Sequence, residues 1–319
     1  MPTHHFTQPL RGIVPPVVTP LTGRDRLDRD ALAHLVERMI DGGVAGLFVL
    51  GTTGEAPALD YRLRYELVEA AAELIAGRVP LLVGVTDPSL TESLDLARHS
   101  SECGAAAIVA APPYYFPLQQ RDLVRYFTLL ADESPLPVFL YNMPACVKID
   151  ISLETIATCT RHANICGVKD SGGNLDYFKQ LLTLREQRRD WTFLIGPEHL
   201  LAESVLLGGD GGVNGGANLH PCLFVDWFAA AVARDLPRIA ALREQVQLLG
   251  QIYRQADEFM AVVRGLKCAL SIAGLCSDQL CEPVTACDAT TRSRIAAIVE
   301  QLGLLPAESP LALMHRGEA

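Results

Sequence analysis

The sequence predicts an α/β fold, a (β/α)8 TIM barrel with a C-terminal helical extension. Three observations predict it. The chain has 319 residues, of which 49% are hydrophobic and 20% charged, so it is long enough for one large barrel and an appendage. Eight short apolar runs alternate with helix-length amphipathic segments, which is the strand count of this barrel. After about residue 232 the alternation stops and only helical patterns follow.

The eight apolar runs are the predicted strands. They are continuously apolar rather than alternating, as strands buried on both faces are. Two prolines weaken the prediction of a strand for the first run, and several glycines weaken it for the last run. These two strands are predicted from their place in the regular alternation. The runs are GIVPPVV (12–18), AGLFVL (45–50), PLLVGV (80–85), AAAIVA (105–110), PVFLY (137–141), ICGV (165–168), TFLIG (192–196) and GGVNG (211–215).

The segments between the runs are predicted helices, and residues 60–77 are typical of them. Leu63, Leu67, Ala70 and Leu74 share one helix face there, and a glycine follows as a stop. A doubly wound sheet is the alternative, but TPLTGRDRLD after the first run is not the G-x-G-x-x-G fingerprint that such a sheet would carry.

We therefore expect two regions. Residues 1–232 form the barrel that carries the active site, and residues 233–319 form the C-terminal helical region. No low-complexity linker separates them, so the second region is expected to pack on the barrel or on a neighbouring subunit.

Composition narrows the function classes. The formal net charge of −10 is spread over short acidic and basic pairs, which argues against nucleic acid or a membrane surface as partner. No apolar run approaches about 18 residues and no signal peptide is evident, so a cytoplasmic protein is expected. The 9 cysteines and 8 histidines show no ligand spacing, so no metal site is predicted. Separated histidines could still converge, which keeps a metal-dependent aldolase as a weaker alternative.

The chain carries 4 lysines against 23 arginines, and one of them, Lys169, ends the sixth apolar run in CGVKDSGGN. A lone lysine beside a turn is usually a solvated charge. In a barrel, however, catalytic groups stand at the carboxyl ends of strands, and burial there lowers a lysine pKa. A fall from about 10.4 to about 8 would raise the neutral fraction at pH 7 from roughly one in 2,500 to roughly one in ten. We expect the neighbouring Asp170 to point away from it, because adjacent strand residues face opposite sides.

A neutral lysine can condense with a ketone to form a protonated Schiff base, which withdraws electrons and lets a bond to the adjacent carbon break or form. Such chemistry needs a proton shuttle. Tyr141 ends the neighbouring fifth run and can supply it, although an aromatic residue that merely caps the core is the alternative.

The substrate also needs an anchor, and GTTGE (51–55) after the second run suits this role. Gly51 lets the backbone come close, and the N–H and hydroxyl groups of Thr52 and Thr53 can hold a carboxylate. Taken alone, the segment could be an ordinary turn. Val213, in the eighth run, completes the predicted substrate-binding set.

Four motifs in this order on successive strand ends resemble the dihydrodipicolinate synthase and N-acetylneuraminate lyase family, the pyruvate-type class I aldolases. They are GTTGE, YYFP, YNMP and GVKDSGGN, and the resemblance spans roughly residues 10–305. It implies a TIM barrel with a C-terminal helical region, no metal or organic cofactor, a 2-oxo acid substrate such as pyruvate or a pyruvate-yielding acid, and a homotetramer.

The resemblance also implies roles for residues. Lys169 would be the Schiff-base lysine and Tyr141 the proton shuttle, while Thr52 and Thr53 would contact the substrate carboxylate. Tyr115 would reach into a neighbouring subunit's site and complete a hydroxyl relay with Thr52, a role that spacing alone does not predict.

Departures from the family pattern bear on the substrate. Lysine-pathway synthases place an arginine two residues after YNxP, where this chain has Cys146, and a thiol cannot hold a carboxylate in the same bidentate way. Lys148 lies two positions further on, which misplaces its charge. The GTTGE motif differs from the GSTGE that is usual in sialic-acid lyases.

The motifs KDSGG and GPE favour aldolases or dehydratases of 2-keto-3-deoxy sugar acids or 4-hydroxy-2-oxo acids. The open alternatives are a dihydrodipicolinate synthase, a related dehydratase, an N-acetylneuraminate lyase, and a keto-acid-binding homologue without turnover.

Overall fold

The computed structural model of the protein describes residues 9–255 and 260–306. In these residues, eight parallel strands pair in one sheet in the order β1, β10, β9, β8, β7, β6, β5, β4. The strands are Gly12–Ile13 (β1), Leu47–Val49 (β4), Leu81–Gly84 (β5), Ala107–Ala110 (β6), Val138–Asn142 (β7), Ile165–Asp170 (β8), Thr192–Ile195 (β9) and Gly211–Gly212 (β10). Each lies within or overlaps one of the eight predicted runs.

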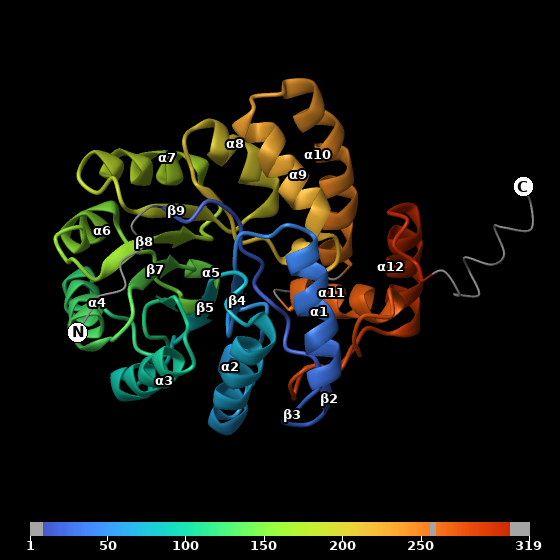
Figure 1. Ribbon diagram of the computed structural model, residues 1–319, viewed down its shortest axis with the longest axis horizontal. Helices are drawn as coiled ribbons and strands as arrows, with labels where there is room; N and C mark the ends of the chain where they lie inside the picture. The colour runs from blue at the N-terminus through green and yellow to red at the C-terminus, as the bar shows by residue number, and fades with distance from the viewer. Residues whose placement is uncertain (1–8, 256–259, 307–319) are drawn as a thin grey trace, which may run out of the picture.

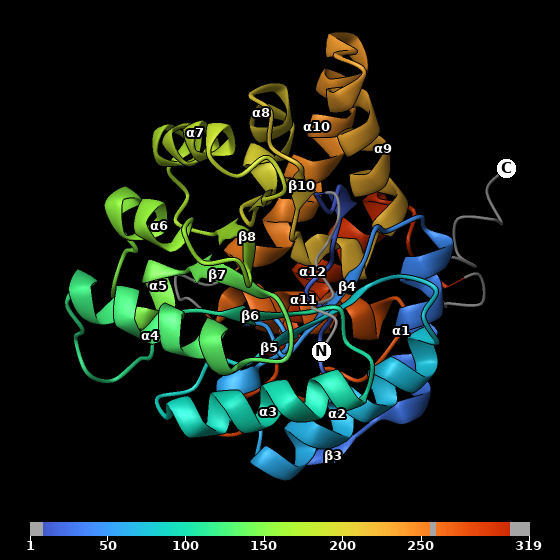
Figure 2. The same cartoon turned by 60° about the vertical axis from the view of Figure 1, so that its left-hand side comes forward.

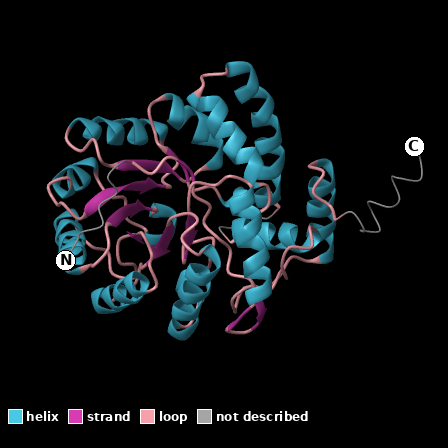
Figure 3. Ribbon diagram, in the orientation of Figure 1, coloured by secondary structure: helices cyan, strands magenta, loops and turns pink. Residues whose placement is uncertain are grey.

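The sheet closes on itself through the first apolar run. Pro16 and Phe48 form a parallel bridge, the Val17 N–H donates to the Phe48 carbonyl at 2.8 Å, and the Phe48 N–H donates to the Pro15 carbonyl at 3.0 Å. Prolines are tolerated here because this pairing uses the carbonyl of Pro15 and needs no proline N–H. The closed parallel sheet with outer helices confirms the predicted TIM barrel, and Figure 3 shows the strands inside the ring of helices.

The outer helices follow the strands as predicted (Figure 1). They are Arg29–Asp41 (α1), Tyr61–Ile75 (α2), Leu90–Glu102 (α3), Gln120–Glu133 (α4), Pro144–Val147 (α5), Leu153–Cys159 (α6), Leu175–Thr183 (α7), Leu201–Leu206 (α8) and Pro221–Val232 (α9). Side chains of Asp28, Asp60, Ser89, Ser152 and Asn174 accept hydrogen bonds from first-turn N–H groups, which fixes where five of these helices begin.

A two-stranded antiparallel hairpin stands outside the barrel sheet, and the sequence did not reveal it. Its strands are Leu21–Gly23 (β2) and Arg26–Leu27 (β3), joined by a turn in which Asp25 has a φ of 51°. The hairpin lies between the first barrel strand and α1 in the chain, and Figure 3 shows it below the main body of helices.

Two apolar clusters separate the inside of the barrel from its outer layer. The larger one fills the space between strands and helices. The smaller one fills the barrel interior and includes Phe48, Leu82, Phe139, Tyr141 and Leu194. A polar group at the top of that interior is therefore surrounded by apolar side chains rather than by water.

Within residues 233–255 and 260–306, three further α-helices follow the barrel, namely Leu236–Gly250 (α10), Ala261–Ile272 (α11) and Ala289–Gln301 (α12). Helix α10 packs on α9, and α11 packs on α12 and on the short helix Gln251–Arg254 (η5). Figure 2 shows α11 and α12 behind the barrel strands. The division at residues 232 and 233 stays a prediction, and parts of both predicted regions, residues 1–8, 256–259 and 307–319, lie outside the described residues.

Candidate active site

A pocket of about 450 Å³ opens at the carboxyl ends of the strands. Its walls come from the segments after β4, β7, β8, β9 and β10 and from the C-terminal helices. Lys169, Tyr141, Thr52, Thr53 and Val213 all line it. Five of the predicted site residues are therefore brought together, as this fold places functional groups at this end of the barrel.

Lys169 lies near the carboxyl end of β8 and is only 5% exposed. Its amine lies 3.8 Å from the centroid of the Tyr141 ring and 4.9 Å from that of Phe48. Oδ1 of Asp170, the next residue, accepts hydrogen bonds from the Asn142 side chain at 2.9 Å and the Gly172 N–H at 3.1 Å, while the buried Oδ2 has no hydrogen-bond partner among the described residues. In the part of the chain that the structure describes, the Lys169 amine has no carboxylate partner.

Burial lowers the pKa of Lys169 to about 7, further than the sequence suggested, and a small opposing influence comes from Cys146. The two aromatic faces also favour the ammonium form, by up to about 2 kcal/mol for a desolvated contact. A shift from 10.5 to about 7 corresponds to about 5 kcal/mol, so burial dominates. About half of the amine is then neutral at pH 7 and available as a nucleophile.

Tyr141 is paired in register with Lys169 across β7 and β8. Its phenol oxygen lies 3.2 Å from the Thr52 hydroxyl, within hydrogen-bonding distance. Burial raises the pKa of Tyr141 to about 12, and hydrogen bonding to Thr52 and Ser171 opposes the rise in part. The phenol is therefore protonated at neutral pH and can act as a proton donor.

The turn after β4 positions Thr52 and Thr53. The Gly54 N–H donates to the Gly51 carbonyl at 3.1 Å, and the Glu55 N–H donates to the Thr52 carbonyl at 3.0 Å. A Cβ on Gly51 would lie 2.7 Å from the ring of Phe48, the same ring that lies under the Lys169 amine. Gly51 is thus required for the backbone to approach this floor of the site, and it lines a second, smaller cavity rather than the main pocket.

Tyr115 is not brought to this pocket. It is 87% exposed, has a φ of 86°, and packs edge-on against the exposed ring of Phe116. A tyrosine in the left-handed region is uncommon and needs a reason. Its expected role in a neighbouring subunit's site remains a prediction. Tyr114 lines the smaller cavity of about 180 Å³ beside Tyr141.

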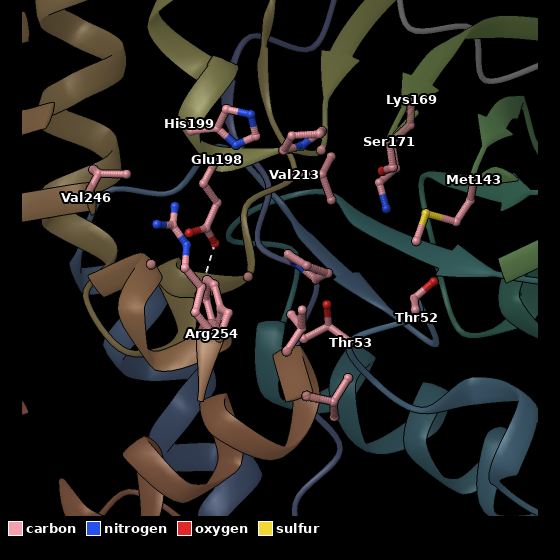
Figure 4. A pocket seen from close by; sticks show the side chains of 18 of the residues that line it. Thr52, Thr53, Met143, Lys169, Ser171, Glu198, His199, Val213, Val246 and Arg254 are labelled. Atoms are coloured by element: carbon pink, nitrogen blue, oxygen red, sulfur yellow. Dashed lines mark hydrogen bonds between the residues drawn. The ribbon is translucent and has the colours of Figure 1, made fainter. Parts of the chain in front are cut away.

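The far half of the pocket contains residues that the sequence did not single out (Figure 4). Glu198 accepts hydrogen bonds from the Gly216 N–H at 2.5 Å and the Tyr253 hydroxyl at 3.1 Å. Burial raises the pKa of Glu198 to about 7, and these hydrogen bonds oppose the rise. In Figure 4, Glu198, His199 and Arg254 lie across the pocket from Lys169, Met143 and Thr52.

The signals for these residues differ. GPE after the seventh run marks Glu198 as a strand-end residue, and this placement could have identified it. Ser171 follows Lys169 within the KDSGGN segment and lines the same pocket. A Cβ on Gly196 would meet the Ser171 hydroxyl at 2.1 Å, so the glycine of GPE makes room for this side chain. Tyr253 and Arg254 both come from the short helix η5, which is distant in sequence from the strand ends, and they belong to no motif.

The residues around the missing arginine behave as expected. Cys146 lines the smaller cavity, and burial raises the pKa of its thiol. The Lys148 amine donates to the Ala145 carbonyl at 2.7 Å on the exposed side of α5, so its charge is directed back to its own helix. Neither residue supplies a bidentate cation to the substrate.

The described residues offer neither a metal site nor a membrane-spanning helix. No group of three or more histidine, cysteine, aspartate or glutamate side chains there is arranged to hold a metal ion. No helix in residues 9–255 or 260–306 is long and apolar enough to cross a membrane.

Comparison with known proteins shows what the chain resembles. A sequence model described as "Dihydrodipicolinate synthetase family" matches residues 9–302. The Escherichia coli protein named "Probable 2-dehydro-3-deoxy-D-pentonate aldolase YjhH" is 32% identical over 298 residues, which cover 92% of this chain and 98% of the relative.

Two solved structures are also similar. A dihydrodipicolinate synthase from Bacteroides thetaiotaomicron has a TM-score of 0.89 and 41% identity, covering 92% of this chain and 99% of that one. YagE from Escherichia coli, crystallised in complex with pyruvate, has a TM-score of 0.86 and 30% identity, with the same coverage.

Proposed function

Because the chain belongs to the dihydrodipicolinate synthetase family, we propose that it is a class I lyase that cleaves or forms a carbon–carbon bond next to a pyruvate unit through a Schiff base on Lys169. The observation that carries this proposal is the Lys169 amine itself. It is buried, its pKa is lowered to about 7, and it lies over the ring of Tyr141 in a pocket of substrate size.

In the first step, the neutral Lys169 amine attacks the C2 carbonyl carbon of the 2-oxo acid. The Tyr141 phenol protonates the hydroxyl of the resulting carbinolamine, which leaves as water, so an iminium ion and a phenolate remain. The positive iminium beside the phenolate reduces the cost of ionising a group with a pKa of about 12. Thr52 stabilises the same phenolate through its hydroxyl, 3.2 Å away.

In the second step, the phenolate takes the proton of the C4 hydroxyl. The C3–C4 bond breaks, an aldehyde is released, and the bonding electrons pass to the iminium, which becomes the enamine of pyruvate. Protonation at C3 and hydrolysis of the imine then return pyruvate and free Lys169. Thr52 and Thr53 line the pocket, which supports a role for their N–H groups and the Thr53 hydroxyl in holding the C1 carboxylate, while the Thr52 hydroxyl stays on Tyr141.

We propose a 2-keto-3-deoxy sugar acid, or a related 4-hydroxy-2-oxo acid, as the substrate. The name of YjhH describes an aldolase of such an acid. The far half of the pocket supports the assignment, because Glu198, Tyr253 and Arg254 offer hydrogen-bonding groups to a hydroxylated chain. Cys146 in place of the arginine of lysine-pathway synthases supports it as well.

A 4-hydroxy-tetrahydrodipicolinate synthase is the second candidate. The specific observation in its favour is the 41% identity to the Bacteroides thetaiotaomicron synthase. The related dehydratases, N-acetylneuraminate lyase and a binding homologue without turnover share the Schiff-base site and remain alternatives.

We further propose a cytoplasmic homotetramer that uses no metal or organic cofactor, in which residues 1–232 form the catalytic barrel and residues 233–319 the helical region. The exposure of Tyr115 and Phe116 supports a subunit contact at this loop, because two adjacent aromatic rings at 87% and 70% exposure are unusual on a free surface. Tyr115 would then extend the Thr52–Tyr141 hydroxyl pair of a neighbouring subunit.

The substrate assignment is tested with a panel of 2-keto-3-deoxy pentonates, hexonates and hexarates, with pyruvate release as the readout. Aspartate semialdehyde with pyruvate tests the synthase alternative in the same series. Efficient cleavage of a sugar acid that is lost in Lys169→Arg supports the proposal. Turnover of aspartate semialdehyde alone would transfer the assignment to the second candidate.

A further inference from the structure

A buried ion pair joins helix α11 to the turn that follows β4. The amine of Lys267 on α11 contacts the carboxylate of Glu55, the last residue of GTTGE, and their side chains are 0% and 2% exposed. Lys267 also donates to the Gln279 carbonyl at 2.8 Å, and Glu55 accepts from the Cys281 N–H at 2.8 Å. The pair therefore connects the turn after β4 to α11 and to residues 279–281, which follow α11 in the chain.

Glu55 is also part of the turn that presents the substrate-binding threonines. Its backbone N–H donates to the Thr52 carbonyl at 3.0 Å. Thr52 is the residue whose hydroxyl contacts Tyr141, so Glu55 is hydrogen-bonded directly to a residue of the site. Its φ of 57° lies in the left-handed region, which a non-glycine residue adopts only when its surroundings hold it there. The anchored side chain of Glu55 is such a constraint.

A contribution to folding stability alone does not explain why this position holds a buried ion pair. Removing two charges from water is costly, and apolar side chains of similar volume often stabilise a core as well or better. An ion pair differs from apolar packing in its directionality, since each partner must meet the other at a fixed distance and orientation. Helix α11 also contributes Val262 and Val263 to the pocket wall, so its placement and that of the turn affect one site.

We propose that Glu55 and Lys267 are a positioning pair that holds the Gly51–Glu55 turn in the conformation in which Thr52 and Thr53 meet the carboxylate of the 2-oxo acid. The C-terminal helices thereby control affinity for the pyruvate half of the substrate. This inference rests on the proposed function. Loss of the pair is expected to weaken pyruvate binding while Lys169, on a different strand, keeps its ability to form the adduct.

The test measures the pyruvate concentration that half-saturates the borohydride-trapped adduct on Lys169. The variants are Glu55→Asp, which keeps the charge but shortens the reach, and the double variant Glu55→Gln with Lys267→Met, which leaves no buried charge unpaired. Asp210→Asn is the matched control. Asp210 is a buried carboxylate, paired with Arg185 at 2.6 Å, that precedes β10 at the opposite end of the barrel.

We expect half-saturation to rise at least tenfold in both Glu55 variants, with the maximum trapped fraction within about twofold of wild type, and to stay unchanged in Asp210→Asn. Thermal unfolding identifies variants that fail to fold. If the double variant fails to fold, the half-saturation measured for Glu55→Asp tests the positioning role. Wild-type half-saturation in a folded Glu55 variant, or an equal rise in Asp210→Asn, overturns the positioning role and leaves the proposed function intact. Absence of any adduct in the wild type overturns both.

Discussion

Lys169 and Tyr141 are register partners on adjacent strands, and the lysine amine lies 3.8 Å from the centroid of the tyrosine ring. One ladder position thus places a nucleophile and a proton donor side by side. The same apolar surroundings move the two pKa values apart, to about 7 for the lysine and about 12 for the tyrosine. At neutral pH the amine can be uncharged while the phenol keeps its proton, which is the combination that Schiff-base formation needs.

The rate of adduct formation should depend on pH through Lys169. At subsaturating pyruvate we expect the rate to rise about tenfold per pH unit well below pH 7 and to level off above it, because only the neutral amine attacks. Stopped-flow or quenched trapping between pH 5 and 9 measures this. A rate that still rises about tenfold per pH unit up to pH 9 would show that the folded protein does not lower the lysine pKa.

Stability should carry the same signature. The pKa of Lys169 is lowered from 10.5 to about 7 on folding, so between these values the unfolded chain binds more protons and the free energy of unfolding rises with pH. Below pH 7 the full cost of burying the ammonium is present. Lys169→Met should therefore stabilise the protein on the order of a few kcal/mol at pH 6 and progressively less towards pH 10. Denaturant unfolding at both pH values checks this, and an equal effect at both would contradict it.

Tyr141→Phe should separate binding from proton transfer. The substitution keeps the ring over Lys169 and removes the hydroxyl, so we expect the turnover rate to fall about 100-fold or more with a smaller change in pyruvate half-saturation. Tyr126→Phe is the matched control, since Tyr126 is a buried tyrosine on α4 outside the pocket. Comparable losses of turnover rate in both variants would mean that removing any buried phenol hydroxyl lowers activity by destabilising the fold.

Glu198→Gln should affect only the aldehyde half of the substrate. Glu198 lies across the pocket from Lys169, and we expect the substitution to weaken the hydrogen bonds proposed between this side chain and a hydroxylated chain. We expect kcat/KM for the preferred sugar acid to fall about tenfold or more, because an amide replaces a carboxyl group that is partly charged at neutral pH. Half-saturation by pyruvate alone should stay at the wild-type value. A rise in the latter would place Glu198 in the pyruvate half instead.

The sequence predicted the barrel because its signal is local and repeated. Each apolar run needs only to be short, buried and followed by an amphipathic segment, so weak members such as GIVPPVV and GGVNG were identified by their place in the series. The β2–β3 hairpin was not predicted, because each of its strands has at most three residues and shows no periodic pattern.

The meeting of Lys169, Tyr141 and Thr52 in one pocket was predictable for the same reason. Lys169, Tyr141 and Thr52 stand at strand ends, where this fold collects its functional groups. Tyr253 and Arg254 were not predictable, because their position depends on how the C-terminal helices pack across the barrel. The same is true of the Glu55–Lys267 pair, whose members are 212 positions apart by their numbering and meet only in the folded chain.

Schiff-base formation on Lys169 is tested most directly by peptide mapping with mass spectrometry after incubation with pyruvate and borohydride. Lys148, Lys179 and Lys267 in the same digest are internal controls, and Lys169→Arg is the matched variant, since arginine keeps the charge but cannot lose its proton. We predict one reduced pyruvyl adduct, on Lys169, that is absent from the variant. A wild-type protein with no adduct, or with the adduct on another lysine, would contradict the account.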